Sequence, residues 1–404
     1  MKTQRAEQIK ELFKREGYHA LVCRTPQHVV MLTGYQPLLG DSFCIISLNA
    51  ANDVETRFAV LSDEMDLVPP GIAVEVKPFA VETMDVIRNS LDAAREPLGE
   101  LLQNAGVGRG SLVGYEGAIE PLIPAYTQLS APSPEMKELL HMLLIGGEIR
   151  DATDLLNELD AIKTEEDLVG IRRAETVALH GFQAARGAIA VGATEAEVAA
   201  ATYAALVQRG YATEGTHHIQ PHVHVMTGAR AALAYKAFNL TSNATIAEGD
   251  TVTVQMEIGV NGYWAELTRS FFAGTISDTW SNAHRACVEA QDAALKKIRA
   301  DANAHDVDAA ARQVMQQAGF GSAFKHGLGH GFGFQAINHA AAPVLHPASK
   351  AILRPGMVHN MEPAVYLDGQ GGFRLNDNVA VQTEGNEVLS SKLPRTLDWL
   401  VVQK

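Results

Sequence analysis

The stretch GDTVTVQMEIGVNGYWAELTRSFF, residues 249–272, carries the pattern that decides the fold of this chain. From Thr251 to Ile258, polar residues alternate strictly with apolar ones, which is the period of a β-strand. This period places Gln255 and Glu257 on the same face of the strand. A polar strand face is either solvated or lines a site. The motifs around this strand favour a site.

Three further segments follow in a defined order, and they are HGLGHGFG (326–333), RPGMVHNMEP (354–363) and GGFRLNDNVAV (371–381). In order and spacing, the whole set resembles the creatinase, aminopeptidase P and prolidase superfamily, peptidase family M24. The resemblance implies a small α/β N-terminal domain followed by an α+β pita-bread catalytic domain. Members of this superfamily are commonly dimeric, so the resemblance also implies a homodimer.

In the metallopeptidases of that superfamily, Asp, Asp, His, Glu and Glu at five positions hold two metal ions. The matching positions in this chain are Gln255, Glu266, His330, Glu362 and Asn376. Glu for Asp keeps the charge and reaches one methylene further, whereas Gln and Asn are neutral amides. The resemblance therefore identifies a divergent member with an altered metal site.

Charge counting bears on how many ions this site can hold. Two divalent ions bring four positive charges, and of the four carboxylates that normally compensate them only Glu266 and Glu362 remain. We therefore expect no dinuclear centre, and our leading prediction is that the protein needs no cofactor. The alternative is one Zn²⁺, Mn²⁺ or Fe²⁺. Its ligands would be Glu266, His330, Glu362 and Glu257.

Proton chemistry alone requires one general base and one general acid. We expect a creatinase-like hydrolase that cleaves a C–N bond of a small polar metabolite. Glu362 and Glu266 would act as base or contact a substrate ammonium group, and His330 would transfer the proton. One alternative is a single-metal Xaa-Pro aminopeptidase, dipeptidase or lyase of the same superfamily, and another is a non-catalytic ligand-binding protein. Glu266 could also be a buried partner of Arg269.

Other side chains are expected to line the substrate pocket. Gln255, Glu257 and Asn376 fit this role, because amides both donate and accept hydrogen bonds. The resemblance adds four residues, which are His326, His339, Arg374 and Phe238. The last of these stands where the superfamily has a histidine. Asp377 matches an acid that is usually structural. Four histidines lie outside the motifs, namely His217, His218, His222 and His224. A surface or loop position is the favoured interpretation, and a metal-binding role is the alternative.

Composition limits the possible partners and compartment. The chain has 404 residues, enough for two domains, and its net charge of −14 argues against nucleic acid and anionic membranes as partners. Its three cysteines indicate a reducing compartment. The opening residues predict a charged amphipathic helix rather than a signal peptide, and no apolar run reaches membrane-spanning length. We expect a cytoplasmic protein whose partner is a small-molecule substrate.

The predicted domains are 1–155 and 156–404. A helix at 3–16 and short apolar strands near 19–24, 42–48 and 58–62 indicate the α/β domain. Thr164 with Asp167, and Thr194 with Glu197, predict two helix starts, the second helix ending at Gly210. Two more helices are expected at 278–300 and 304–318.

Overall fold

The structure, a computed structural model, describes residues 3–40, 42–117, 134–236, 241–339, 341 and 344–403. The chain divides into two compact units, Met1–Asp160 and Ala161–Lys404. The predicted boundary at 155/156 lies close to this division. Phe238, expected in the pocket, lies outside the described residues.

The first unit is built on a mixed sheet with the strand order β4-β3-β2-β1-β5-β6. Its strands are β1 (Ala20–Cys23), β2 (Phe43–Leu48), β3 (Val54–Leu61), β4 (Glu75–Phe79), β5 (Leu112–Tyr115) and β6 (Glu148–Asp151). Its helices are α1 (Thr3–Glu16), α2 (Pro26–Thr33), α3 (Ser90–Asn104), α4 (Pro134–Leu143) and α5 (Thr153–Ala161). Leu98 and Leu101 of α3 and Leu139 of α4 pack into one apolar cluster with the strands. The sequence prediction of a small α/β unit agrees with this arrangement.

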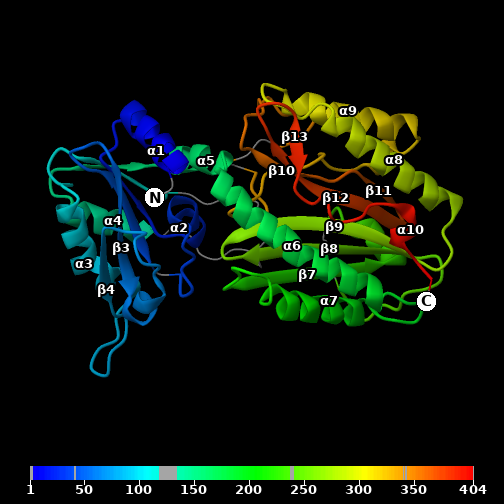
Figure 1. Ribbon diagram of the computed structural model, residues 1–404, viewed down its shortest axis with the longest axis horizontal. Coiled ribbons are helices and arrows are strands. Elements are labelled where there is room, and N and C mark those ends of the chain that lie inside the picture. The colour runs from blue at the N-terminus through cyan, green and yellow to red at the C-terminus, as the bar shows by residue number, and fades with distance from the viewer. Residues whose placement is uncertain are drawn as a thin grey trace. The chain divides into compact units, whose positions relative to one another are not determined.

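The second unit contains a long antiparallel sheet with the strand order β10-β12-β9-β8-β7 (Figure 1). Its strands are β7 (Ile219–Thr227), β8 (Thr251–Val260), β9 (Tyr263–Ala273), β10 (Val358–Met361), β11 (Ala364–Leu367), β12 (Gly371–Val381), β13 (Asn386–Val388) and β14 (Val401–Val402). β11 and β13 also pair with β12, and β14 pairs in parallel with β9. The strands β8, β9 and β12 are buried along their whole length.

Helices cover one face of this sheet. They are α6 (Glu165–Ala188), α7 (Glu195–Gly210), α8 (Asp278–Leu295), α9 (Ala304–Gln317) and the short α10 (Leu397–Leu400). Figure 1 shows α6 lying across β8 and β9, with α7 along β7. Both predicted capping boxes are present, at Thr164 and at Thr194. Among the described helices, none is long and apolar enough to cross a membrane.

The alternation of β8 explains which face the helices cover. Val252, Val254, Met256 and Ile258 pack into the same apolar cluster as Val177 and Phe182 of α6. The residues between them therefore lie on the opposite face. That face carries the polar side chains of the candidate site.

Candidate active site

Four neighbouring strands place one row of side chains on the face opposite the helices. Pairing across the sheet brings together His224 of β7, Gln255 of β8, Thr268 of β9 and Asn376 of β12. A second row lies two residues away from the first on β7, β8 and β9 and contains His222, Glu257 and Glu266. Opposing side chains on one sheet face lie about 5 Å apart at Cβ. The sheet alone therefore concentrates two carboxylates, two amides and two imidazoles.

His330 is supplied by the glycine-rich segment 326–333, which runs beside β10. The amide of Asn360 donates to the carbonyl of His330 at 3.0 Å, and the amide of Glu362 donates to the carbonyl of Leu328 at 2.7 Å. The side-chain oxygen of Asn360 accepts from the His330 amide at 2.7 Å. A Cβ on Gly329 would lie 2.0 Å from the carbonyl oxygen of Asn360, so only glycine permits this approach.

Glu266, His330 and Glu362 converge from three separate segments. His330 Nε2 lies 3.1 Å from Glu266 Oε2 and 4.0 Å from Glu362 Oε1. The three residues are 2%, 7% and 8% exposed, so their charges are largely removed from water. Asn360 Nδ2 lies 3.0 Å from Glu266 Oε2 and 3.1 Å from His330 Nε2. The motif comparison did not single out Asn360, although it sits two residues before Glu362.

Burial and neighbouring charges move the pKa values of two of these groups. Burial lowers the pKa of His330, but the carboxylates of Glu266 and Glu362 outweigh it and raise the pKa to about 9. Burial raises the pKa of Glu362 well above its usual range, against the opposing effect of Arg374. The cluster therefore has more negative than positive charge to satisfy, and a cation placed there would be stabilised.

Glu257 links the cluster to β7. It is fully buried, and Gln255 Nε2 donates to Glu257 Oε1 at 2.5 Å and to Glu266 Oε1 at 3.3 Å. Glu257 Oε2 lies 3.1 Å from His224 Nε2. His222, two residues earlier on the same face, stacks on Trp264 with ring centroids 6.0 Å apart. The interpretation of His222 and His224 as surface or loop residues was therefore wrong.

The remaining predicted residues lie around this cluster in different ways. Arg374 Nη1 lies 3.5 Å from Glu362 Oε2. The ring of His339 lies 5.0 Å from that of His330, and His339 also borders an open depression of about 650 Å³. His326 contacts the carbonyl of Gly327 and the Tyr366 hydroxyl, at 2.7 and 3.1 Å. These contacts occupy both ring nitrogens of His326, which suits an orienting role better than the predicted substrate contact.

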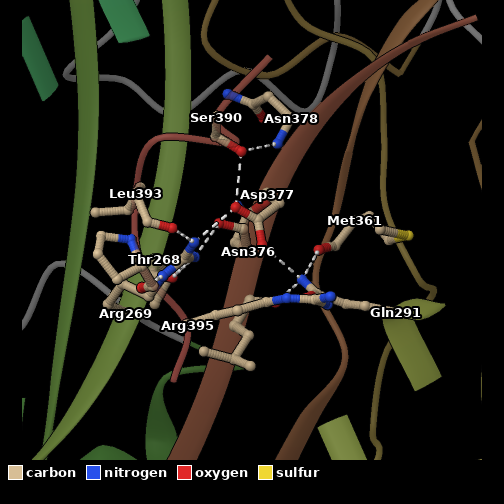
Figure 2. A network of polar contacts seen from close by, with 12 residues as sticks. Thr268, Arg269, Gln291, Met361, Asn376, Asp377, Asn378, Ser390, Leu393 and Arg395 are labelled. Atoms are coloured by element: carbon tan, nitrogen blue, oxygen red, sulfur yellow. Dashed lines mark hydrogen bonds and ion pairs between the residues drawn. The ribbon is translucent and has the colours of Figure 1, made fainter. Parts of the chain in front are cut away.

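A buried network on the other side of β12 holds the site-bearing strands together (Figure 2). Arg269, fully buried, donates to Asp377 Oδ1 at 2.6 Å and to the carbonyl of Asn376 at 2.8 Å. Gln291 Nε2 of α8 donates to Asp377 Oδ2 at 3.1 Å and to the carbonyl of Met361 at 3.2 Å. Arg269 thus pairs with Asp377, and the alternative that it pairs with Glu266 was wrong. Asp377 is structural, on the face opposite Asn376.

Comparison with known proteins agrees with this geometry. The model of metallopeptidase family M24 matches residues 169–383, more than half of the 404-residue chain. The chain belongs to family M24. M24 is a family of peptidases, which are hydrolases that act on C–N bonds, in agreement with the predicted enzyme class.

The chain is also similar to individual peptidases and to a solved peptidase structure. An Xaa-Pro dipeptidase of Pyrococcus furiosus is 28% identical over 243 residues, which is 60% of this chain and 67% of that protein. The putative dipeptidase YkvY of Bacillus subtilis is 26% identical, and the match covers 64% of its length. The X-Pro aminopeptidase structure from Thermotoga maritima is 20% identical and covers 98% of this chain and 100% of its own, with a TM-score of 0.77. These matches confirm the predicted fold, an α/β N-terminal domain with a pita-bread catalytic domain.

The family corrects one prediction. M24 is a family of metallopeptidases, so the leading expectation that no cofactor is needed was wrong. Tetrahedral ligands at about 2.1 Å place their donor atoms about 3.4 Å apart. The 3.1 Å between Glu266 and His330 fits that spacing, whereas Glu362 is somewhat far at 4.0 Å. As they stand, no three His, Cys, Asp or Glu side chains in the described ranges form a group that could hold an ion.

The donor types nevertheless distinguish one ion from two. Two carboxylates and one imidazole, from Glu266, Glu362 and His330, suit a single Zn²⁺, Mn²⁺ or Fe²⁺. A second ion would need the positions of Gln255 and Asn376, which supply only neutral amides. By donor type, these residues therefore suit one divalent ion better than two.

Proposed function

We propose that this protein hydrolyses a C–N bond in a small, dipeptide-like substrate, with one divalent ion rather than two. The observation that carries the proposal is the convergence of Glu266, His330 and Glu362 beside two amide-substituted ligand positions. Similarity to Xaa-Pro dipeptidases favours this alternative over the creatinase-like, metal-free reaction. The matched region covers about two thirds of these relatives, so their activity enters here as a proposal.

Glu266, His330 and Glu362 would hold the ion. When bound, a divalent ion supplies Lewis acidity that polarises a scissile carbonyl. Asn360 donates to Glu266 and contacts His330, and so fixes the orientation of both side chains. Because all three ligands are almost fully buried, the polar contacts around them act in a medium of low polarity, where they are stronger than in water.

Arg374 is placed to receive an anionic end of the substrate. Within the described part of the chain, its Nε and Nη2 atoms have no hydrogen-bond partner although the residue is only 4% exposed. A guanidinium with two free N–H groups matches a carboxylate through paired hydrogen bonds. We assign to Arg374 the terminal carboxylate of the substrate.

Glu257 and His224 form an acid–base pair beside the cluster. Their 3.1 Å contact allows a proton taken up at Glu257 Oε2 to be shared with His224 Nε2. The His224 side chain is 12% exposed and that of Glu257 is fully buried, so the histidine gives the proton a route toward solvent. This pair could serve proton transfer without using a ligand of the ion.

Metal content and hydrolysis test the proposal together. The protein is loaded with Mn²⁺, Zn²⁺ or Fe²⁺, desalted, and analysed by plasma mass spectrometry and with a panel of Xaa-Pro dipeptides. We expect one ion per chain and dipeptide hydrolysis, and no retained ion in His330→Gln. His284→Gln is the matched control, because His284 contacts the carbonyl of Arg395 in the helical layer. Two ions per chain, or an ion retained in His330→Gln, would refute the proposal.

A further inference from the structure

One row of the sheet beside Glu257 and Glu266 contains buried polar atoms without partners. Within the residues that the structure describes, no hydrogen bond reaches Gln255 Oε1, Thr268 Oγ1, Asn376 Oδ1 or Asn376 Nδ2. Gln255 is 2% exposed, and Thr268 and Asn376 are fully buried. Cross-strand pairing sets the three residues side by side on β8, β9 and β12. Buried polar groups without partners cost stability, so such a group of four indicates a place where a ligand makes the missing bonds.

We propose that this row binds a neutral, planar group with an NH₂ and a carbonyl, namely a primary carboxamide or ureido group of the substrate. The proposal rests on the proposed function, because it names the group that the single-metal hydrolase recognises beside the scissile bond. The row consists of Gln255, Thr268 and Asn376, and we call it the amide row. Under this proposal, the three residues of the amide row determine which substrates the protein accepts.

The donors and acceptors of the amide row match such a group. Gln255 Nε2 is already used by Glu257 and Glu266, which leaves its Oε1 free to accept. Asn376 presents a free acceptor and a free donor on one amide, so it can form two parallel hydrogen bonds with another amide. Thr268 Oγ1 can donate to the second lone pair of the bound carbonyl. An ammonium group has three donors and no acceptor, and would leave Asn376 Nδ2 without a partner.

Charge favours the neutral group as well. The three carboxylates of Glu257, Glu266 and Glu362 are balanced by Arg374 together with one divalent ion, when the histidines are counted as neutral. No net negative charge then remains for an ammonium group bound at the amide row, and burying an uncompensated ammonium ion there would be costly. A second divalent ion is disfavoured for the same reason.

A pair of probes that differ in one group tests this inference. N-(2-carbamoylethyl)proline carries the carboxamide, and N-(2-aminoethyl)proline carries an ammonium group in its place. In both compounds an amine replaces the scissile amide, so binding is measured without turnover. Isothermal titration calorimetry on protein loaded with one ion should show at least about 100-fold tighter binding of the carboxamide probe.

Isosteric variants test whether the amide row causes the preference for the carboxamide probe. Asn376→Asp replaces the free donor by an acceptor and adds a negative charge, and should reduce the preference at least about tenfold in favour of the ammonium probe. Asn282→Asp makes the same change on the exposed face of α8, where Asn282 accepts from Arg285, and should leave the preference unchanged. Thr268→Val is a second, uncharged test in case Asn376→Asp does not fold. It should weaken only the carboxamide probe, by roughly five- to tenfold.

The outcomes separate this inference from the proposed function. Equal or tighter binding of the ammonium probe, or no binding of either probe to protein holding one ion, would overturn the inference. A protein that holds one ion and hydrolyses Xaa-Pro dipeptides but prefers the ammonium probe would keep the proposed function and lose the inference. A protein that holds no ion yet prefers the carboxamide probe would refute the proposed function and keep the inference.

Discussion

Replacing Asp377 by asparagine should destabilise the catalytic unit strongly, because among the described residues Asp377 is the carboxylate in ion-pair contact with the buried Arg269. Arg269 is fully buried and donates to Asp377 Oδ1 at 2.6 Å, and its other hydrogen bonds go to backbone carbonyls. Asparagine is isosteric with aspartate, so the shape of the core is kept. The change therefore isolates the charge of the network shown in Figure 2.

The contacts of Asp377 set the magnitude. Breaking a buried ion pair by removing one partner costs about 3–5 kcal/mol. Asp377 Oδ2 also accepts from Gln291 Nε2 at 3.1 Å, and an amide nitrogen placed there would face another donor. Asp377 Oδ1, by contrast, can remain an oxygen that accepts from Arg269 and from Ser390 at 2.7 Å. We therefore expect a loss of about 3 kcal/mol, at the lower end of that range.

Urea unfolding followed by tryptophan fluorescence measures this loss in the right part of the chain. The three tryptophans, Trp264, Trp280 and Trp399, all lie in the unit that contains Asp377. Asp368→Asn is the matched control, since Asp368 pairs with Lys325 at 2.7 Å while its side chain is 81% exposed. The control should lose less than about 1 kcal/mol. Equal losses in the two variants would refute the assignment of Asp377 as the charge that holds β9 and β12.

Two further changes test other parts of this unit. Burial raises the pKa of Glu175 to about 8, so between the ordinary value of 4.5 and 8 the unfolded chain releases a proton that the folded chain keeps, and stability falls as pH rises. In urea titrations near pH 6–7, the unfolding free energy of Glu175→Gln minus that of the parent protein should therefore increase by about 1.4 kcal/mol for each unit by which the pH rises. A difference that does not change with pH would contradict this pKa. Gly329→Ala places a Cβ 2.0 Å from the carbonyl oxygen of Asn360 and should cost at least about 1–3 kcal/mol and reduce retained metal. Gly187→Ala, where a Cβ meets nothing within 4 Å, should cost nothing, and equal thermal melting shifts would refute this account of Gly329.

Local rules predicted much of the fold. Strict alternation predicted β8 and its polar face, and the two capping boxes predicted where α6 and α7 begin. These signals depend on residues that are close in sequence, so a single chain is enough to detect them. The convergence of Glu266, His330 and Glu362 needed long-range pairing, and the resemblance to a family supplied it.

Residues without a motif were harder to place. The alternation in HVHV at 222–225 would have put His222 and His224 on one strand face, but only the β7–β8 register shows that this face is shared with Gln255 and Glu257. Asn360 was missed because its amide acts between two segments far apart in sequence. Register and loop packing depend on the whole sheet, and a periodicity within one strand does not specify them.

The two amides also bear on the proposed recognition of a ligand. Had Gln255 and Asn376 only filled the core, apolar residues would have served and would have avoided three buried polar atoms without partners. Gln255 instead donates from its side-chain nitrogen to both neighbouring carboxylates, which leaves its oxygen without a partner. The backbone carbonyl of Asn376 accepts a hydrogen bond from Arg269. Residues that are held in place by these contacts and yet lack partners for their own polar atoms are better explained by ligand recognition than by packing alone.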